Sequence, residues 1–168
     1  MSDASSPIRW RCCCFDELGV RELQHIYMAR QQVFVVEQAC AYLDADGVDE
    51  RSWHLAAWSP AQREPLAYAR IVAPGVKYAE ASIGRVITTA AARGTGLGRE
   101  LVGRAVARAE AIFPGHGIRI SAQAHLARFY AAFGFETVGP EYLEDGIPHI
   151  EMLRPPAITS TASSSGRC

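Results

Sequence analysis

Arg93-Gly94-Thr95-Gly96-Leu97-Gly98 lies between two different periodic patterns, and the change from one to the other is the strongest indication of the fold. Residues 77–88 before it are typical of a strand, whereas residues 96–113 carry apolar side chains at helical spacing. Three glycines at alternate positions permit a tight turn and a close approach of backbone N–H groups to a ligand. The helix that starts there adds the positive end of its dipole, so the stretch predicts an anion site suited to a diphosphate.

Two familiar phosphate-binding loops do not fit this stretch. The dinucleotide-binding fingerprint needs a third glycine one position later, where Arg99 stands. A Walker loop needs lysine and then Ser or Thr after its last glycine, but Gly98 is followed by Arg99 and Glu100. A plain strand-to-helix turn without a ligand remains the alternative, because glycine-rich turns are common.

The pattern outside this stretch predicts an α/β fold with a mixed, mostly antiparallel sheet. Helices are expected at residues 18–35, 96–113 and 124–133. Strands are expected at residues 8–15, 52–58, 65–73, 77–88, 117–122, 135–138 and 147–153. Short polar connections between residues 52 and 88 are typical of an antiparallel meander. The strand–helix–strand unit around the glycines then implies one parallel pairing.

Length and composition indicate one domain of a soluble protein. The 168 residues suit a single domain, expected at residues 8–154 between flexible tails at residues 1–7 and 155–168. Basic and acidic side chains nearly cancel, at 17 against 18, which argues against nucleic-acid or membrane partners. No apolar run reaches the ~20 residues needed to cross a bilayer.

The five cysteines favour reduced thiols in a cytoplasmic protein. Three of them, Cys12, Cys13 and Cys14, are consecutive, which makes a poor disulfide framework. Their spacing matches no metal motif, so no metal is expected. A homodimer is the default assembly, since symmetric dimers are the commonest.

Two segments resemble the acetyl-CoA site of the GNAT superfamily of N-acetyltransferases. The first is the Arg-Gly-x-Gly-x-Gly loop after a strand that ends at residues 83–88. The second is residues 122–135, where Phe129-Tyr130 and Gly134-Phe135 recur and Gln123 replaces the usual Asn. Residues 30–38, 44–49 and 145–152 resemble the ElaA-type branch. The resemblance implies the GNAT fold, in which a parallel strand pair splays apart between flanking helices.

The resemblance also implies a set of cofactor contacts. Backbone groups of Val86, Ile87 and Thr88 would pair with the pantetheine arm of acetyl-CoA, and Gln123 belongs to the second cofactor segment. Tyr130 would lie near the sulfur. The amides that would hold the pyrophosphate are those of Arg93, Gly94, Thr95, Gly96, Leu97 and Gly98. The acceptor would be a primary amine, on a small molecule or a peptide.

The implied chemistry needs a base and an acid. An amine with a pKa near ~10.4 is mostly protonated at neutral pH and must lose a proton before it attacks. Tyr130 is the candidate acid for the leaving thiolate, because a phenol with a reference pKa of ~10 still carries its proton. Glu37 and His149 are the candidate bases. Their alternatives are a solvated helix-end carboxylate for Glu37 and a structural turn histidine for His149.

The sequence is also consistent with two other functions. Arg30, Phe34, Arg70 and the aspartates of residues 44–49 faintly resemble acyl-homoserine lactone synthases, which share the fold. A non-catalytic CoA-binding module is the second alternative. The same aspartates, Asp44, Asp46 and Asp49, are expected either to attract a cationic acceptor or to form a solvated turn.

Overall fold

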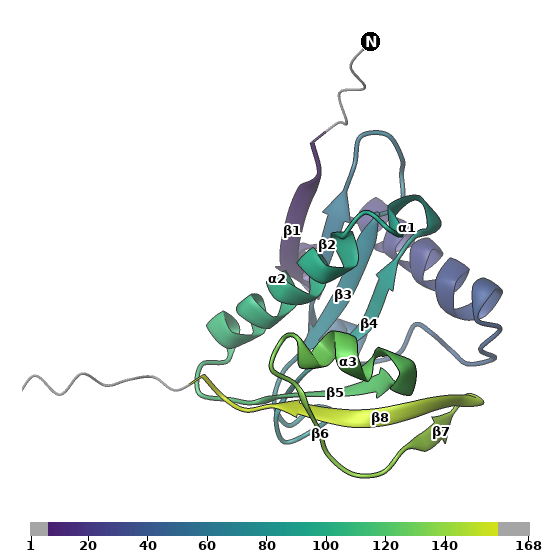
Figure 1. Ribbon diagram of the computed structural model, residues 1–168. Helices are drawn as coiled ribbons and strands as arrows, with labels where there is room; N and C mark the ends of the chain where they lie inside the picture. Colours follow the sequence, from purple (N-terminus) through teal and green to yellow (C-terminus); the bar gives the residue numbers. More distant parts are fainter. Residues whose placement is uncertain (1–6, 158–168) are drawn as a thin grey trace, which may run out of the picture.

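Eight strands form one sheet in the order β1-β2-β3-β4-β5-β8-β6, with β7 paired to β8 (Figure 1). The computed structural model describes residues 7–157. The strands are β1 (Arg9–Cys14), β2 (Ser52–Trp58), β3 (Ala67–Val72), β4 (Ala81–Thr88), β5 (Ile118–Gln123), β6 (Glu136–Thr137), β7 (Tyr142–Glu144) and β8 (Ile147–Arg154). The helices are α1 (Val20–Gln31), a π-helical segment at Gln32–Glu37, α2 (Leu97–Ile112) and α3 (Ala127–Ala131). The predicted α/β fold with a mostly antiparallel mixed sheet is confirmed.

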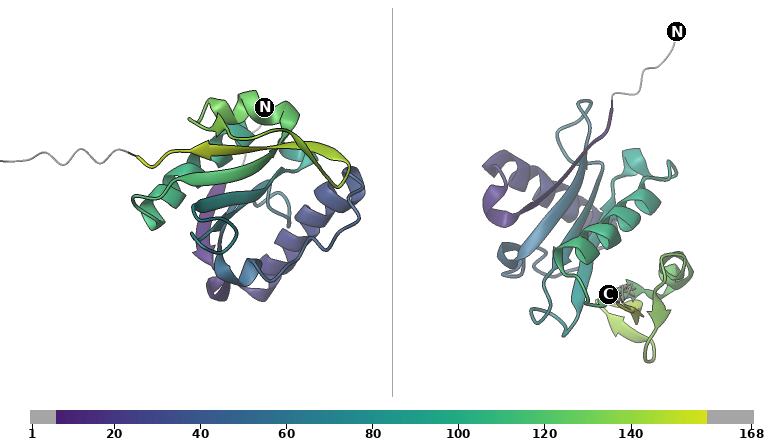
Figure 2. Two further views of the ribbon diagram at one scale, coloured as in Figure 1. Left: turned by 90° about the horizontal axis from the view of Figure 1, so that it is seen from below. Right: turned by 90° about the vertical axis from the view of Figure 1, so that its left-hand side faces the viewer.

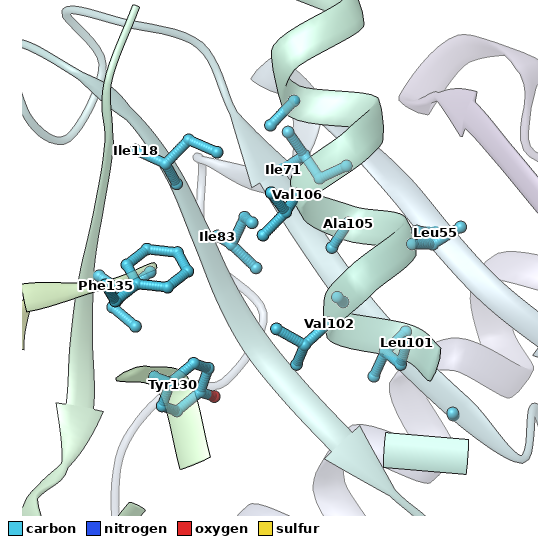
Figure 3. Close-up of a cluster of buried hydrophobic side chains, with 14 of the residues drawn as sticks. Leu55, Ile71, Ile83, Leu101, Val102, Ala105, Val106, Ile118, Tyr130 and Phe135 are labelled. Carbon is cyan, nitrogen blue, oxygen red and sulfur yellow. The ribbon is translucent and has the colours of Figure 1, made fainter. Parts of the chain in front are cut away.

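Helices α1 and α2 cover opposite faces of strands β1–β4, as the side view in Figure 2 shows. Alternate side chains of each strand supply the two cores, because successive residues point to opposite faces. On one face Leu101, Val102 and Ala105 of α2 pack with Ile71 and Ile83 (Figure 3). On the other face α1 contributes Ile26, Ala29 and Val33, which pack against residues such as Ala56, Tyr68 and Ile87.

Strands β4 and β5 form the expected parallel pair and then part. They pair only at Ala81 with Ile118 and at Ser82 with Arg119. Beyond that point the two strands diverge in Figure 1. The register between β3 and β4 also shifts between Tyr68 and Arg70, and Arg85 at this bulge has a φ of 51°. A bulge bends its strand and redirects side chains, so the opening between β4 and β5 is built into the backbone of β4.

Three local expectations differ from the structure. The helix expected at residues 18–35 is α-helical only to Gln31 and continues as the π-helical segment, because spacing of apolar residues does not separate the two forms. The strand expected from residue 77 begins at Ala81, after a turn. Strand β7 was not expected; its three residues are all exposed and carry no apolar alternation.

Residues 1–6 and 158–168 lie outside the described residues, and the tails expected at residues 1–7 and 155–168 fall largely there. The domain boundaries at residues 8 and 154 stay a prediction. Among the described residues, no helix is long and apolar enough to cross a membrane.

Candidate active site

A cavity of about 340 Å³ lies where β4 and β5 part. Its walls come from β3, β4, β5 and α3, from the β7–β8 hairpin, and from the segment between α1 and β2. Four of the predicted site residues line it: Val86, Gln123, Tyr130 and His149. Six parts of the chain that are separated in the sequence therefore meet at this cavity.

The other predicted site residues lie outside the lining of this cavity. Ile87 is 3% exposed in the core under α1, and Thr88 ends β4. Residues 93–98 form the turn into α2, and Glu37 ends the π-helical segment. The predicted set thus divides into residues that line the cavity and residues outside its lining.

The glycine loop has the backbone form that its sequence predicts. Gly94 and Gly96 have φ values of 77° and 86°, a region that favours glycine. Gly96 is the N-cap of α2. Within residues 7–157, the N–H groups of Gly94, Gly96 and Gly98 donate to no other protein atom. A diphosphate fits these residues, because unpaired amides at a helix N-terminus are the usual donors for it.

Gly98 has a different role from the two glycines before it. Its φ is not positive, and a Cβ there would lie 3.5 Å from Thr88 Cγ2. At Gly94 and Gly96 an added Cβ would meet nothing within 4 Å. A side chain at Gly98 would therefore begin in ordinary van der Waals contact with Thr88, whereas Gly94 and Gly96 have the backbone conformation that favours glycine.

Tyr130 combines a buried ring with a position in the cavity wall. It is 8% exposed and packs edge to face with Phe129 and Phe135, at ring distances of 5.2 and 6.0 Å; Figure 3 shows its hydroxyl at the edge of this cluster. Burial raises the pKa of Tyr130 to about 12, because the phenolate would lose its hydration. The phenol therefore keeps its proton at every pH at which an acyltransferase works.

Glu37 and Gln38, at the end of the π-helical segment, contact opposite sides of the gap between β4 and β5. Glu37 forms an ion pair with Arg93 of the glycine loop, and Arg93 Nε donates to the carbonyl of Thr88 at 3.2 Å. Gln123 Nε2, at the end of β5, donates to Gln38 Oε1 at 3.3 Å. The end of the π-helical segment thus contacts both the glycine loop and a residue that lines the cavity.

His149 lies on β8, opposite Gln123 in the register. Its Nδ1 is 2.8 Å from the carbonyl of Ile147, a contact that needs the proton on Nδ1. In the neutral ring Nε2 then carries the lone pair, and Nε2 lies 3.7 Å from Glu144. This tautomer suits a proton acceptor in the cavity wall.

Six charged side chains behind the cavity form a closed ring of ion pairs, which sequence reasoning missed. Each aspartate joins two arginines: Asp44 joins Arg30 and Arg85, Asp46 joins Arg70 and Arg85, and Asp49 joins Arg30 and Arg70. We call these six residues the ion-pair ring. Its charges cancel, so it adds directed donors and acceptors to the site without net charge.

The ion-pair ring corrects the expectation of a solvated aspartate turn. Asp44 and Asp49 are 4% and 1% exposed, and Arg30 is fully buried. Burial raises the pKa of Asp49, but the hydrogen bonds from Arg30 and Arg70 outweigh it and hold that pKa below its usual range. The sequence does contain one signal for these buried ion pairs. Arg30 is a cation on the apolar face of α1, between Ile26 and Val33, and a buried cation needs a partner.

Comparison with known proteins identifies the family. A family model described as an acetyltransferase (GNAT) domain matches residues 52–154. The chain belongs to the GNAT family. A UPF0039 protein of Synechocystis is 44% identical over 146 residues, covering 87% of this chain and 94% of that protein. Protein ElaA of Escherichia coli is 40% identical over 149 residues, covering 88% and 96%. This GNAT protein is therefore ElaA-like, as its sequence predicted.

Solved structures agree with this assignment. The structure of an acyl-CoA N-acyltransferase from Pseudomonas aeruginosa superposes with a TM-score of 0.84 at 41% identity, covering 88% of this chain and 99% of that one. Escherichia coli ElaA gives a TM-score of 0.82 at 39% identity over 88% of this chain and 99% of its own. The acyl-homoserine lactone synthase LasI gives 0.70 at 13% identity, covering 89% and 90%, and this shows a shared fold alone. As a GNAT protein, the chain is an acyltransferase that uses acyl-CoA.

Proposed function

We propose that this GNAT protein transfers the acetyl group of acetyl-CoA to a primary amine by direct attack. One observation carries the proposal: Tyr130 and Val86 line the same cavity at the point where β4 and β5 part. The free amides of the glycine loop stand at the end of β4. A thioester bound along β4 would have an acid on one side and space for an acceptor on the other.

The described residues fit the parts of acetyl-CoA in order. The amides of residues 93–98 and the α2 dipole would hold the pyrophosphate. Backbone groups of Val86, Ile87 and Thr88 would pair with the pantetheine arm as an added strand. Gln123 at the end of β5 would complete the cofactor side, once its amide exchanges Gln38 for the ligand.

The reaction requires three proton transfers. The acceptor ammonium loses one proton before its nitrogen attacks the carbonyl carbon and a second from the tetrahedral adduct, and backbone N–H groups near Thr88 would stabilise the oxyanion. The carbon–sulfur bond then breaks, and the thiolate takes a proton from Tyr130. The phenol is recharged from solvent. Tyr130 suits this step because burial keeps it protonated.

Two side chains are proposed for the removal of the first proton. His149 lines the cavity, and its Nε2, 3.7 Å from Glu144, carries the lone pair of the neutral ring. Glu37 is exposed and paired with Arg93, so it would have to release that arginine first. We therefore place His149 nearer to the acceptor, with Glu37 as the alternative base.

Thiol release is the direct test of this function. The protein is incubated with acetyl-CoA and a library of primary amines, and free CoA thiol and acetylated amine are both measured. Release that depends on an amine supports the proposal. Saturable CoA binding without amine-dependent release from any member would favour a non-catalytic CoA-binding module.

The acyl-homoserine lactone synthase alternative has its own test. The residues that suggested it include Arg30, Arg70 and the aspartates, and these residues form the ion-pair ring. S-adenosylmethionine offered with acetyl-CoA and longer acyl-CoA donors should yield no lactone. Lactone formation would replace the amine acetyltransferase proposal.

A further inference from the structure

The three arginines of the ion-pair ring differ in which of their nitrogen atoms are already bonded. Arg30 uses Nε, Nη1 and Nη2 on Asp44 and Asp49, and it is fully buried. Arg70 uses both terminal nitrogens, Nη1 and Nη2, and its Nε is buried without a hydrogen-bond partner among the described residues. Arg85 uses Nε and Nη2 on Asp44 and Asp46, and its Nη1 has no hydrogen-bond partner in residues 7–157. Arg85 is thus the arginine with a spare terminal nitrogen.

The spare nitrogen of Arg85 is accessible from the cavity. Arg85 lines the cavity, and its side chain is 19% exposed, against 0% for Arg30 and 4% for Arg70. Its guanidinium is held at two nitrogens by the aspartates and flanked by the rings of Phe34 and Tyr42, at 5.9 and 5.2 Å. A donor fixed in this way loses little entropy when it binds an acceptor oxygen.

The backbone conformation of Arg85 also indicates that its side chain is held in a particular direction. Arg85 has a φ of 51°, in the left-handed region that strains a non-glycine residue. The strain falls at the bulge of β4, one residue before Val86. Such strain is found where a side chain must point into a site. The guanidinium therefore stands beside the expected path of the thioester.

We infer that Arg85 binds a carboxylate of the acceptor, which would make the acceptor an amino-acid-type molecule that carries its amine and carboxylate together. This inference rests on the proposed amine acetylation. Lys77 adds positive charge to the cavity lining, while Glu144 and Asp145 on the β7–β8 hairpin add negative charge. A lining of both signs suits a zwitterion better than a polyamine or a polyanion.

Matched acceptor sets test the inference in the intact protein. Each set holds an amino acid, its amide and its decarboxylated amine, such as L-lysine, L-lysinamide and cadaverine, or L-phenylalanine, L-phenylalaninamide and 2-phenylethylamine. With acetyl-CoA saturating, wild type should prefer the acid in at least one set by about tenfold or more in kcat/KM, the size of a charged hydrogen bond. Ratios near one in every set would overturn the inference.

Two arginine variants separate recognition from support of the fold. In Arg85→Lys the shorter ammonium can serve the two aspartates but has no second nitrogen for the acceptor, so the acid-to-amide ratio should fall towards one. Arg30→Lys perturbs the same ion-pair ring away from the cavity and should keep the wild-type ratio. The ratio within one sample cancels the active fraction, and comparing that ratio between variants at one pH cancels the difference in amine pKa between the two acceptors. An unchanged ratio in Arg85→Lys would contradict the inference.

A binding measurement distinguishes failure of this inference from failure of the proposed function. If no amine releases CoA thiol, the proposed acetyl transfer is wrong, and thermal stabilisation of the CoA-bound protein by N-acetyl-L-lysine and N-acetyl-L-phenylalanine is measured against their amides. Stabilisation by the acids that is lost in Arg85→Lys would keep the carboxylate site. Equal stabilisation by acids and amides, or none by either, would reject it.

Discussion

The proposed active site has two sides, one for the cofactor and one for the acceptor, and different parts of the protein form them. The proposed cofactor side, at the glycine loop, uses backbone: unpaired amides, two glycines with positive φ, and the start of α2. The acceptor side uses side chains from segments far apart in the sequence, which the ion-pair ring holds in place. A diphosphate is the same in every acyl-CoA, so one local motif can bind it, whereas the acceptor differs between enzymes and needs side chains.

Replacing Arg30 tests whether the ion-pair ring stabilises the acceptor side, and it should have the largest effect. Arg30→Met leaves Asp44 and Asp49 buried with fewer partners, which should cost about 3–5 kcal/mol of the free energy of unfolding. Chemical denaturation measures this loss. Arg104→Met is the matched control, because its pair with Glu100 is about half exposed and should cost about 1 kcal/mol or less. Equal losses in the two variants would mean that the ion-pair ring contributes no more than a surface pair.

Tyr130→Phe tests the chemistry where the two sides meet. It removes the proton and keeps the ring, so turnover should fall by roughly 10²–10⁴ while CoA affinity changes little. Because burial raises the pKa of Tyr130 to about 12, the rate of wild type should show no fall between pH 8 and 10. Tyr78→Phe, at a half-buried position outside the cavity lining, serves as the control. If Tyr130→Phe turns over like wild type when chemistry limits the rate, water is the acid.

The sequence predicted the cofactor side well, because that side depends on residues close together. The glycine loop, the helix after it and the parallel pair of β4 and β5 follow from one continuous stretch, residues 81–123. Gly94 and Gly96 could be assigned because few residues other than glycine adopt their backbone conformation. Their roles with acetyl-CoA stay predictions.

The acceptor side could not be predicted in the same way. Arg30 and Arg85 are 55 positions apart, and nothing local shows that Asp44 joins them. The ion pair of Glu37 with Arg93 is equally non-local. A buried cation in an apolar stripe signals that some partner exists, but it does not say which carboxylate provides it.

The glycine loop offers a test of the cofactor side alone. Gly96→Ala places a side chain at a φ of 86° with nothing within 4 Å, so it strains the backbone from which the free amides extend. CoA affinity, measured by calorimetry, should fall about tenfold or more as those amides shift. Gly115→Ala is closely matched, with a φ of 79° and equally open space beyond the other end of α2. It should lose similar stability and keep wild-type affinity. A folded Gly96→Ala protein with unchanged affinity would move the pyrophosphate elsewhere.

Glu37→Gln probes the contact between the two sides and should have the smallest effect. The Glu37 carboxylate neutralises Arg93 beside the free amides, so its removal should lower the KM for acetyl-CoA a few-fold at low salt, an effect that high salt suppresses. Glu64→Gln, at a partly exposed position outside the cavity, is the control. Since Glu37 does not line the cavity, the pH–rate profile should keep its wild-type shape. A steep fall in rate at neutral pH that recovers at alkaline pH, where free amine is abundant, would instead make Glu37 the base. A rise in KM would mean that Glu37 orients Arg93 for the diphosphate.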